Sequence, residues 1–128
     1  MNTSRNGKNI LLVGETYFIQ NELAQFFQEQ GFDVMSIGSD GKELLTGISI
    51  NPEIIILDYE MQHNDPYLVT AILHKALPTS FIALMNGHSR HCDQAEAMSA
   101  GAHKILSRTC DALEFEHILQ GIEEEVHA

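Results

Sequence analysis

Acidic and basic side chains stand at the ends of three short apolar runs in this sequence. Glu15 follows the first run by two residues, Asp58 ends the third, and Arg108 follows the fifth by two residues. Two carboxylates could share a hard divalent cation such as Mg²⁺, which takes oxygen ligands and usually keeps several waters. A solvated acidic loop tip would contain the same residue types, so the residues alone leave both interpretations open.

The apolar runs themselves predict the elements that position these side chains. They are short, rich in β-branched residues and almost free of polar alternation, which is typical of strands buried on both faces of a parallel sheet. We therefore expect five strands, at residues 9–13, 32–37, 53–58, 80–85 and 103–106.

Apolar residues recur at helical spacing between and after these strands, with capping residues and stops at their ends. Helices are expected over residues 19–28 with a stop at Gly31, from Asp40, from Asp65 to just before Pro78, over residues 89–100 closed by Gly101, and from Asp111 to near residue 126. This alternation predicts an α/β fold: a doubly wound, five-stranded parallel sheet of flavodoxin-like order 2-1-3-4-5, with helices on both faces.

In a sheet of this kind the functional crevice lies beyond the carboxyl ends of the strands, where the strand order reverses. That rule predicts that the residues following strands one, three, four and five lie near one another. They are Gly14, Glu15, Asp58, Met85, Asn86, Ser107 and Arg108.

Composition narrows the classes of function. The 128 residues carry 18 acidic against 7 basic side chains, a net charge of −11 that repels nucleic acid. The two cysteines, Cys92 and Cys110, have no metal-ligand spacing and are too few for a disulfide framework, which favours a reducing cytoplasm. No apolar run is long enough to span a bilayer. We expect one domain over residues 1–128, with its core at about 8–123 and no output domain.

Four segments resemble the landmark segments of the receiver domains of two-component response regulators, in order and at similar spacing. They are V-G-E at residues 13–15, P-E-I-I-I-L-D-Y-E-M at 52–61, A-G-A at 100–102 and L-S-R at 106–108. The second segment, together with the later A-G-A, is the most diagnostic. The similarity extends over about residues 8 to 123.

The resemblance implies roles for individual residues. Asp58 corresponds to the aspartate that receives a phosphoryl group from a histidine kinase, and Arg108 stands where the family has a phosphate-contacting lysine. Such transfer needs a metal and fixed positive charge around the phosphoryl oxygens. Glu15, Asp58 and the backbone carbonyl of Glu60 are therefore the implied ligands of a weakly bound Mg²⁺.

Several positions depart from the family pattern. Gly14-Glu15 replaces an acidic pair, Met85 replaces the threonine or serine, and Ile105 replaces the switch aromatic. An arginine is larger than a lysine and planar, so the exchange at Arg108 is not neutral at a tight phosphate site. The remaining departures in the loop after Asp58 are Gln62 for proline and Pro66 for glycine.

Two functional classes follow from this combination. The first is a pseudo-receiver: a signalling interaction module, not an enzyme, that docks a histidine kinase, phosphotransfer protein or effector through its fourth helix, fifth strand and fifth helix. The second is a working phosphoacceptor that takes a phosphoryl group on Asp58 with Mg²⁺. The retained acceptor favours the second class, whereas the loss of both hydroxyl and aromatic favours the first. A homodimer through the last helices is a further possibility.

The histidines suggest one other site. His88 and His91 stand three residues apart, with Cys92 adjacent. A zinc site needs three or four protein ligands, so these residues are better interpreted as surface side chains than as a soft-metal centre.

Overall fold

The computed structural model describes residues 7–14, 22–87, 90–108 and 112–127. Within them a single sheet contains five parallel strands in the order β2-β1-β3-β4-β5. These strands are β1 (Asn9–Val13), β2 (Asp33–Ile37), β3 (Ile54–Asp58), β4 (Phe81–Met85) and β5 (Lys104–Leu106). The predicted flavodoxin-like order is confirmed.

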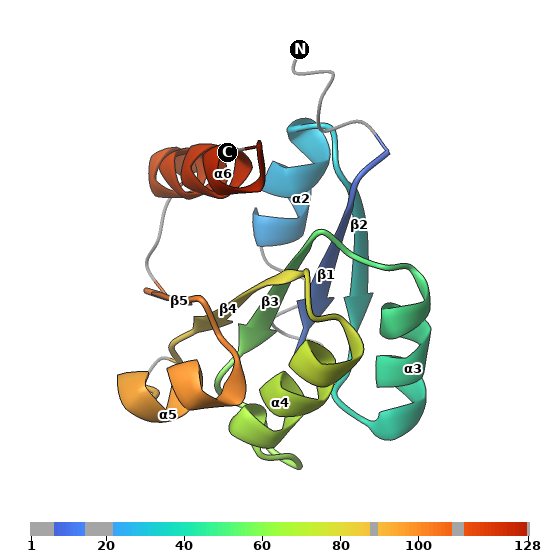
Figure 1. The fold of residues 1–128 in the computed structure, drawn as a ribbon, viewed down its shortest axis with the longest axis vertical. Helices are drawn as coiled ribbons and strands as arrows, with labels where there is room; N and C mark the ends of the chain where they lie inside the picture. Colours follow the sequence, from blue (N-terminus) through green and yellow to red (C-terminus); the bar gives the residue numbers. More distant parts are fainter. Residues whose placement is uncertain (1–6, 15–21, 88–89, 109–111, 128) are drawn as a thin grey trace.

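Helices cover both faces of the sheet (Figure 1). α2 (Glu22–Glu29) and α6 (Ala112–His127) lie on one face. α3 (Gly41–Ser49), α4 (Pro66–Ala76) and α5 (Gln94–Ala100) lie on the other. The two-sided cover explains why every residue of β3 is buried.

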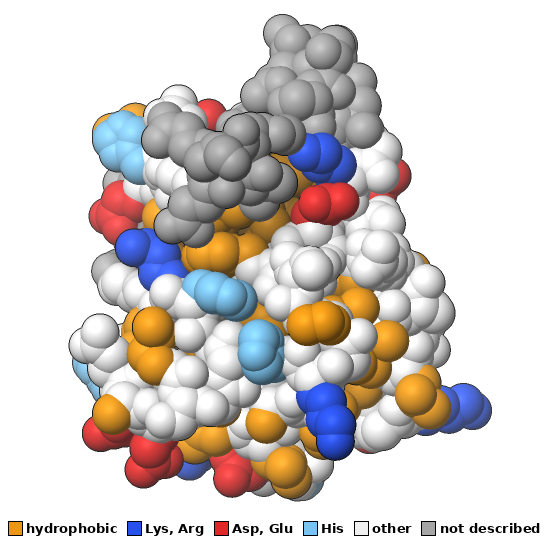
Figure 2. Space-filling model, viewed as in Figure 1, with side chains coloured by type: hydrophobic (Ala, Val, Ile, Leu, Met, Phe, Trp, Pro, Cys, Tyr) orange, Lys and Arg blue, Asp and Glu red, His pale blue; other side chains and the backbone are white. Residues whose placement is uncertain are grey.

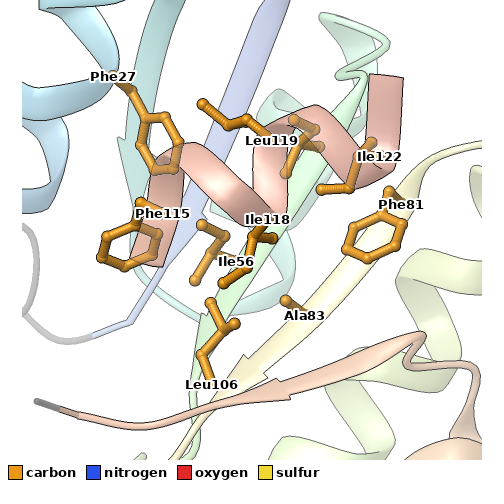
Figure 3. A pocket seen from close by; sticks show the side chains of 10 residues that line it. Phe27, Ile56, Phe81, Ala83, Leu106, Phe115, Ile118, Leu119 and Ile122 are labelled. Carbon is orange, nitrogen blue, oxygen red and sulfur yellow. The ribbon is translucent and has the colours of Figure 1, made fainter. Parts of the chain in front are cut away.

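The core beneath α2 and α6 is rich in aromatic rings. The Phe27 ring lies edge-on to Phe115 and to Phe32, with centroids 5.7 and 6.0 Å apart. These contacts join α2, α6 and the start of β2 in one cluster. Figure 3 shows a small apolar hollow between α6 and the sheet. At about 10 Å³ it barely reaches the size of one water and has no polar lining, so it is a packing defect and not a ligand site.

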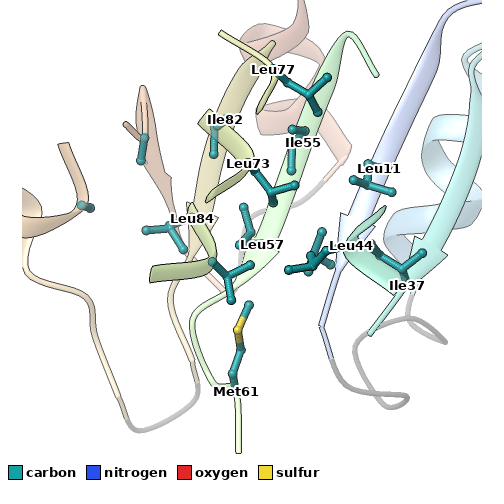
Figure 4. Close-up of a cluster of buried hydrophobic side chains, with 14 residues drawn as sticks. Leu11, Ile37, Leu44, Ile55, Leu57, Met61, Leu73, Leu77, Ile82 and Leu84 are labelled. Atoms are coloured by element: carbon teal, nitrogen blue, oxygen red, sulfur yellow. The ribbon is translucent and has the colours of Figure 1, made fainter. Parts of the chain in front are cut away.

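The core on the opposite face is aliphatic. Leu73 of α4 and Leu44 of α3 pack against Leu57 and Ile55 of the central strand, with Met61 below them (Figure 4). Truncating a fully buried leucine such as Leu73 typically costs about 2–5 kcal/mol. This face therefore anchors the helices that surround the carboxyl end of β3.

Most predicted boundaries agree with the structure. Each strand begins and ends within one residue of its predicted bounds. Asp40 and Asp65 cap their helices by accepting hydrogen bonds from the Glu43 and Tyr67 amides. Gly31 and Gly101 follow α2 and α5 with φ of 100° and 117°, conformations that favour glycine. Ile19 and Asp111, which were predicted to belong to the first and last helices, lie outside the described residues.

The predicted start of the fourth helix is wrong. Arg90 to Cys92 are not helical, and α5 begins at Gln94 with Asp93 as its N-cap. The Asp93 carboxylate accepts a hydrogen bond from the Glu96 amide at 2.9 Å. The Cys92 amide is instead bonded to the side chain of Asn86 earlier in the same loop, and the Asp93 amide to the Tyr67 hydroxyl of α4, which holds this segment outside the helix. Cys92 therefore precedes the helix.

No described helix combines the length and the apolar character that a membrane crossing requires.

Candidate functional site at the carboxyl ends of the strands

The register of the sheet places the ends of three strands together. Asp58 is paired with Met85, and Met85 with Leu106. The loops that follow β3, β4 and β5 therefore begin side by side, as the strand-end rule predicts. Asn86 extends the alignment, since its amide donates to the Leu106 carbonyl at 2.9 Å.

Asp58 is a buried carboxylate at the end of β3, with 4% of its surface exposed. Its Oδ1 accepts a hydrogen bond from the Glu60 amide at 3.0 Å. The same oxygen accepts a hydrogen bond from the Arg108 guanidinium, which forms an ion pair with it. Among the described residues, the polar contacts to Asp58 all fall on Oδ1, so Oδ2 is the oxygen left for a further ligand.

Arg108 bridges two elements with its planar group. One terminal nitrogen contacts Asp58, and Nε donates to the Asn86 carbonyl at 3.1 Å. The Arg108 side chain is only 13% exposed, so both bonds form largely away from water. An arginine spreads its donors over a rigid fork, whereas a lysine concentrates its charge on one nitrogen. The arginine is therefore suited to hold the carboxylate and the β4 loop at once.

Burial raises the pKa of Asp58 above its ordinary value of 3.8. Loss of hydration is the largest influence because it disfavours the charged carboxylate. The Glu60 amide and the Arg108 charge act in the opposite direction, and the nearby Glu60 carboxylate raises the pKa slightly further. The ion pair thus offsets part of the burial cost and not all of it.

The positions around Asp58 that would complete the family's site are apolar or lack a side chain. Met85 is 3% exposed and belongs to the core that packs under α6. Gly14 is buried and its amide donates to the Ile37 carbonyl at 3.0 Å. Ile105 is half-buried and packs against the opposite core. Glu15, a predicted metal ligand, lies outside the described residues.

Glu60, whose carbonyl was predicted to bind the metal, stands in the loop directly after Asp58. Its side chain lies over Gly87, where an added Cβ would come within 2.2 Å of the Glu60 Cγ. Only a residue without a side chain at position 87 allows the β3 and β4 loops to approach this closely. The structure thus brings Asp58, Glu60 and Arg108 together.

A pair of tyrosines beside the site was not predicted from the sequence to act together. The Tyr67 hydroxyl of α4 donates to the Tyr59 hydroxyl at 3.3 Å and accepts from the Asp93 amide at 2.7 Å. Burial and the bond to Tyr59 raise the pKa of Tyr67 to about 12, which keeps the phenol protonated. The sequence gives no signal for this contact because the two rings come from different elements.

A groove lies between α5 and β5, on the predicted docking face. Its lining includes Met98, Lys104 and Ile105, together with His91 and Cys92. On the face drawn in Figure 2, apolar side chains are interspersed with pale blue histidines, and acidic side chains gather along the lower edge. Within the described part of the chain, no group of three or more potential metal-binding side chains comes together. His88 of the suggested soft-metal site is not among the described residues.

Comparison with known sequences identifies the family. Residues 10–120 match the family model of the response regulator receiver domain. The chain is 25% identical over 120 residues to a protein-glutamate methylesterase/protein-glutamine glutaminase of Halobacterium salinarum, in a match that covers 92% of this chain and 34% of that protein. The chain thus spans about a third of the length of the curated relatives it matches.

Solved structures share the fold. A two-component response regulator from Clostridium difficile superposes with a TM-score of 0.80 at 17% identity, covering 94% of this chain and 99% of that one. A response regulator protein from Burkholderia pseudomallei, solved with a phosphorylated aspartic acid, calcium ion and citrate, gives 0.71 at 20% identity, covering 94% and 71%. Since the family model spans most of the sequence, this chain belongs to the receiver domains of response regulators, the signalling modules of two-component systems.

Proposed function

We propose that this receiver domain acts chiefly as an interaction module and that phosphorylation of Asp58 is weakened. The observation that carries the proposal is the buried ion pair between Arg108 and Asp58. A metal or phosphoryl group has to compete with a guanidinium that already neutralises the carboxylate. Separating a buried ion pair is costly, so this ion pair opposes phosphorylation of the carboxylate.

The described oxygens fit Mg²⁺ only in part. Mg²⁺ requires near-octahedral coordination and is usually bound by one or two carboxylates plus waters. Asp58 Oδ2 and the Glu60 carbonyl would hold it, and Glu15 would be the second carboxylate, because Gly14 has none to offer. The bound ion would neutralise charge on the transferring phosphoryl group. We propose that the ion binds weakly at this incomplete site.

Met85 removes a second requirement of transfer. A hydroxyl at the end of β4 could donate to a phosphoryl oxygen as its negative charge develops, and such donors contribute strongly in a dry site. The thioether of Met85 is buried among apolar side chains and has no proton to donate. Arg108 is thus the described cation that would contact the phosphoryl group, after releasing Asp58 Oδ1.

The docking face that we propose consists of α5, β5 and α6. The groove between α5 and β5 combines the apolar Met98 and Ile105 with the cationic Lys104. Met98 is 49% exposed and lines the groove beside Ile105, so this face offers apolar surface to a partner. A histidine kinase, a phosphotransfer protein or an effector protein would bind there, and a second copy of this chain is a further candidate.

The alternative is a working phosphoacceptor with Mg²⁺. It is favoured by the location of the described contacts on Oδ1, which leave Oδ2 for covalent attack on a phosphoryl group. The similar response regulator of Burkholderia pseudomallei, solved with a phosphorylated aspartic acid and a calcium ion, supports the same chemistry. In that case Arg108 would turn from the carboxylate to the phosphoryl oxygens.

Incubation with Mg²⁺ and a small phosphoryl donor tests the proposal. Intact mass reports phosphorylation, and amide NMR reports binding of Mg²⁺ near Asp58 and Glu60. We expect small Mg²⁺-dependent shifts and little added mass, with Asp58→Asn as the control. Prompt and complete addition of one phosphoryl group, lost in Asp58→Asn, would establish the phosphoacceptor instead.

A further inference from the structure

Two separate routes lead from Asp58 to consecutive residues. One consists of hydrogen bonds throughout, and the other begins with the peptide bond to Tyr59 and continues through hydrogen bonds. Both run to the segment that precedes α5, at the amides of Cys92 and Asp93. Asp93 is the N-cap of α5, so the two routes hold the first turn of that helix. Their convergence ties the state of Asp58 to the position of an element in the docking face.

The first route passes through Arg108. Its guanidinium bonds Asp58 with one nitrogen and the Asn86 carbonyl with another. The Asn86 side chain continues the route, since its Oδ1 accepts from the Cys92 amide at 2.9 Å. A shift of Arg108 away from Asp58 would thus act on Asn86, the residue that holds Cys92.

The second route passes through the two tyrosines. Tyr59 directly follows Asp58, and its hydroxyl accepts from Tyr67, which in turn accepts from the Asp93 amide. The Tyr59 and Tyr67 rings pack edge to face, with centroids 5.5 Å apart. The rings and the hydroxyl bonds therefore move together.

We propose that these two routes couple Asp58 to α5, in place of the hydroxyl and aromatic switch that Met85 and Ile105 have replaced. The inference rests on the proposed function, because α5 matters as part of the docking face. Neutralising or occupying Asp58 releases Arg108, which repositions Asn86 and the Cys92 amide that it holds. The same change at the end of β3 moves the adjoining Tyr59 and, through Tyr67, the Asp93 amide. Asn86 and Tyr67 are thus positioning residues that act through the start of α5.

The coupling is tested by perturbing Asp58 without metal or phosphate. Asp58→Asn removes the charge that holds Arg108, and amide NMR follows the response at Cys92 and Asp93. We expect both amides to shift in the otherwise unchanged chain. In an Asn86→Ala/Tyr67→Phe background, the same substitution leaves them in place while the Glu60 amide still shifts. Amides that stay unmoved in the first case, or shift undiminished in the second, would overturn the coupling.

Single variants keep the test decisive if the double variant is too unstable. Tyr67→Phe retains the ring but removes the hydroxyl that bonds the Asp93 amide. The variant should therefore abolish the response of Asp93 and leave that of Cys92. Hydrogen exchange at Asp93 then quickens roughly five- to tenfold, the loss expected for one hydrogen bond. Asn86→Asp retains the acceptor oxygen and preserves the response of Cys92. Equal responses of both amides in Tyr67→Phe would contradict the existence of two routes.

The outcome is independent of phosphorylation. A chain that gains a phosphoryl group readily would refute the weakened site and leave the NMR result untouched. Conversely, uncoupled amides in a chain that resists phosphorylation would refute the coupling alone.

Discussion

The ends of β3 and β5 differ from the ends of β1 and β4, although all four strands border the same crevice. β3 and β5 lead to Asp58 and Arg108, a carboxylate and a cation in direct contact. β1 is followed by Gly14 and β4 ends at Met85, and these two residues bring neither charge nor hydroxyl. Among the described residues, one half of the crevice is charged, and the other is part of the packed interior.

The two halves thus contribute different properties to the crevice: one contributes charge and the other contributes apolar packing. In the charged half, the Arg108 guanidinium offsets part of the cost of burying the Asp58 carboxylate. The apolar half contributes packing, since Met85 is buried in the core beneath α6. Each half can therefore be broken alone, and the consequences should differ in kind.

Loss of the cation is expected to have the largest effect on stability. Arg108→Ala leaves Asp58 buried without its partner, which should lower the free energy of unfolding by about 3 kcal/mol at pH 7. Urea denaturation measures this decrease in the free energy of unfolding. Arg90→Ala is the matched control, because Arg90 is exposed and lies 5.9 Å from the Tyr59 ring centroid. Arg90→Ala should lower the free energy of unfolding by about 0.5 kcal/mol. Equal costs for the two variants would contradict a structural ion pair.

Restoring a hydroxyl in the apolar half should have a smaller cost. Met85→Thr buries a polar group and removes apolar volume, so we expect a loss of about 2 kcal/mol in urea denaturation. Met85→Leu conserves volume and should stay below about 1.5 kcal/mol. If threonine is tolerated as well as leucine, position 85 already has a polar environment and the contrast between the halves fails.

The smallest expected effect is a pH dependence that comes from Asp58. Because burial raises its folded pKa, the folded state binds the proton more tightly than the unfolded state does. Relative to Asp58→Asn, the wild-type chain should gain stability as pH falls through the raised pKa toward 3.8. Paired denaturation series over pH 7 to about 4 isolate this difference, since the histidines are common to both proteins. A relative loss of stability on acidification would mean that Arg108 outweighs burial.

The sequence predicted much of this arrangement for identifiable reasons. Runs such as that before Asp58 are short and rich in β-branched residues, which favours a buried strand and indicates its bounds. The alternation of these strands with helices then predicts the strand order. The strand-end rule then brought Asp58, Asn86 and Arg108 together. The spacing of Asp93 and Glu96 is a capping pattern, and it marks the true start of α5.

Other features depended on tertiary contacts that no local pattern contains. Asp93 stays extended as the N-cap of α5 in part because the Tyr67 hydroxyl, 26 residues away in the chain, accepts its amide hydrogen. Likewise, Arg108 contacts both Asp58 and the Asn86 carbonyl because of the distance between two loops. Such distances are set by packing of whole elements and are not encoded at one position.

The rate of phosphorylation in a repaired crevice tests the central claim most directly. Wild type and Gly14→Asp/Met85→Thr are incubated with Mg²⁺ and the same small phosphoryl donor, and intact mass is followed over time, with Asp58→Asn as the blank. We predict that the repaired chain gains one phosphoryl group roughly a hundredfold faster, since the hydroxyl introduced by Met85→Thr alone would restore one transition-state contact of about that size. Equal and rapid modification of both chains would contradict a weakened site.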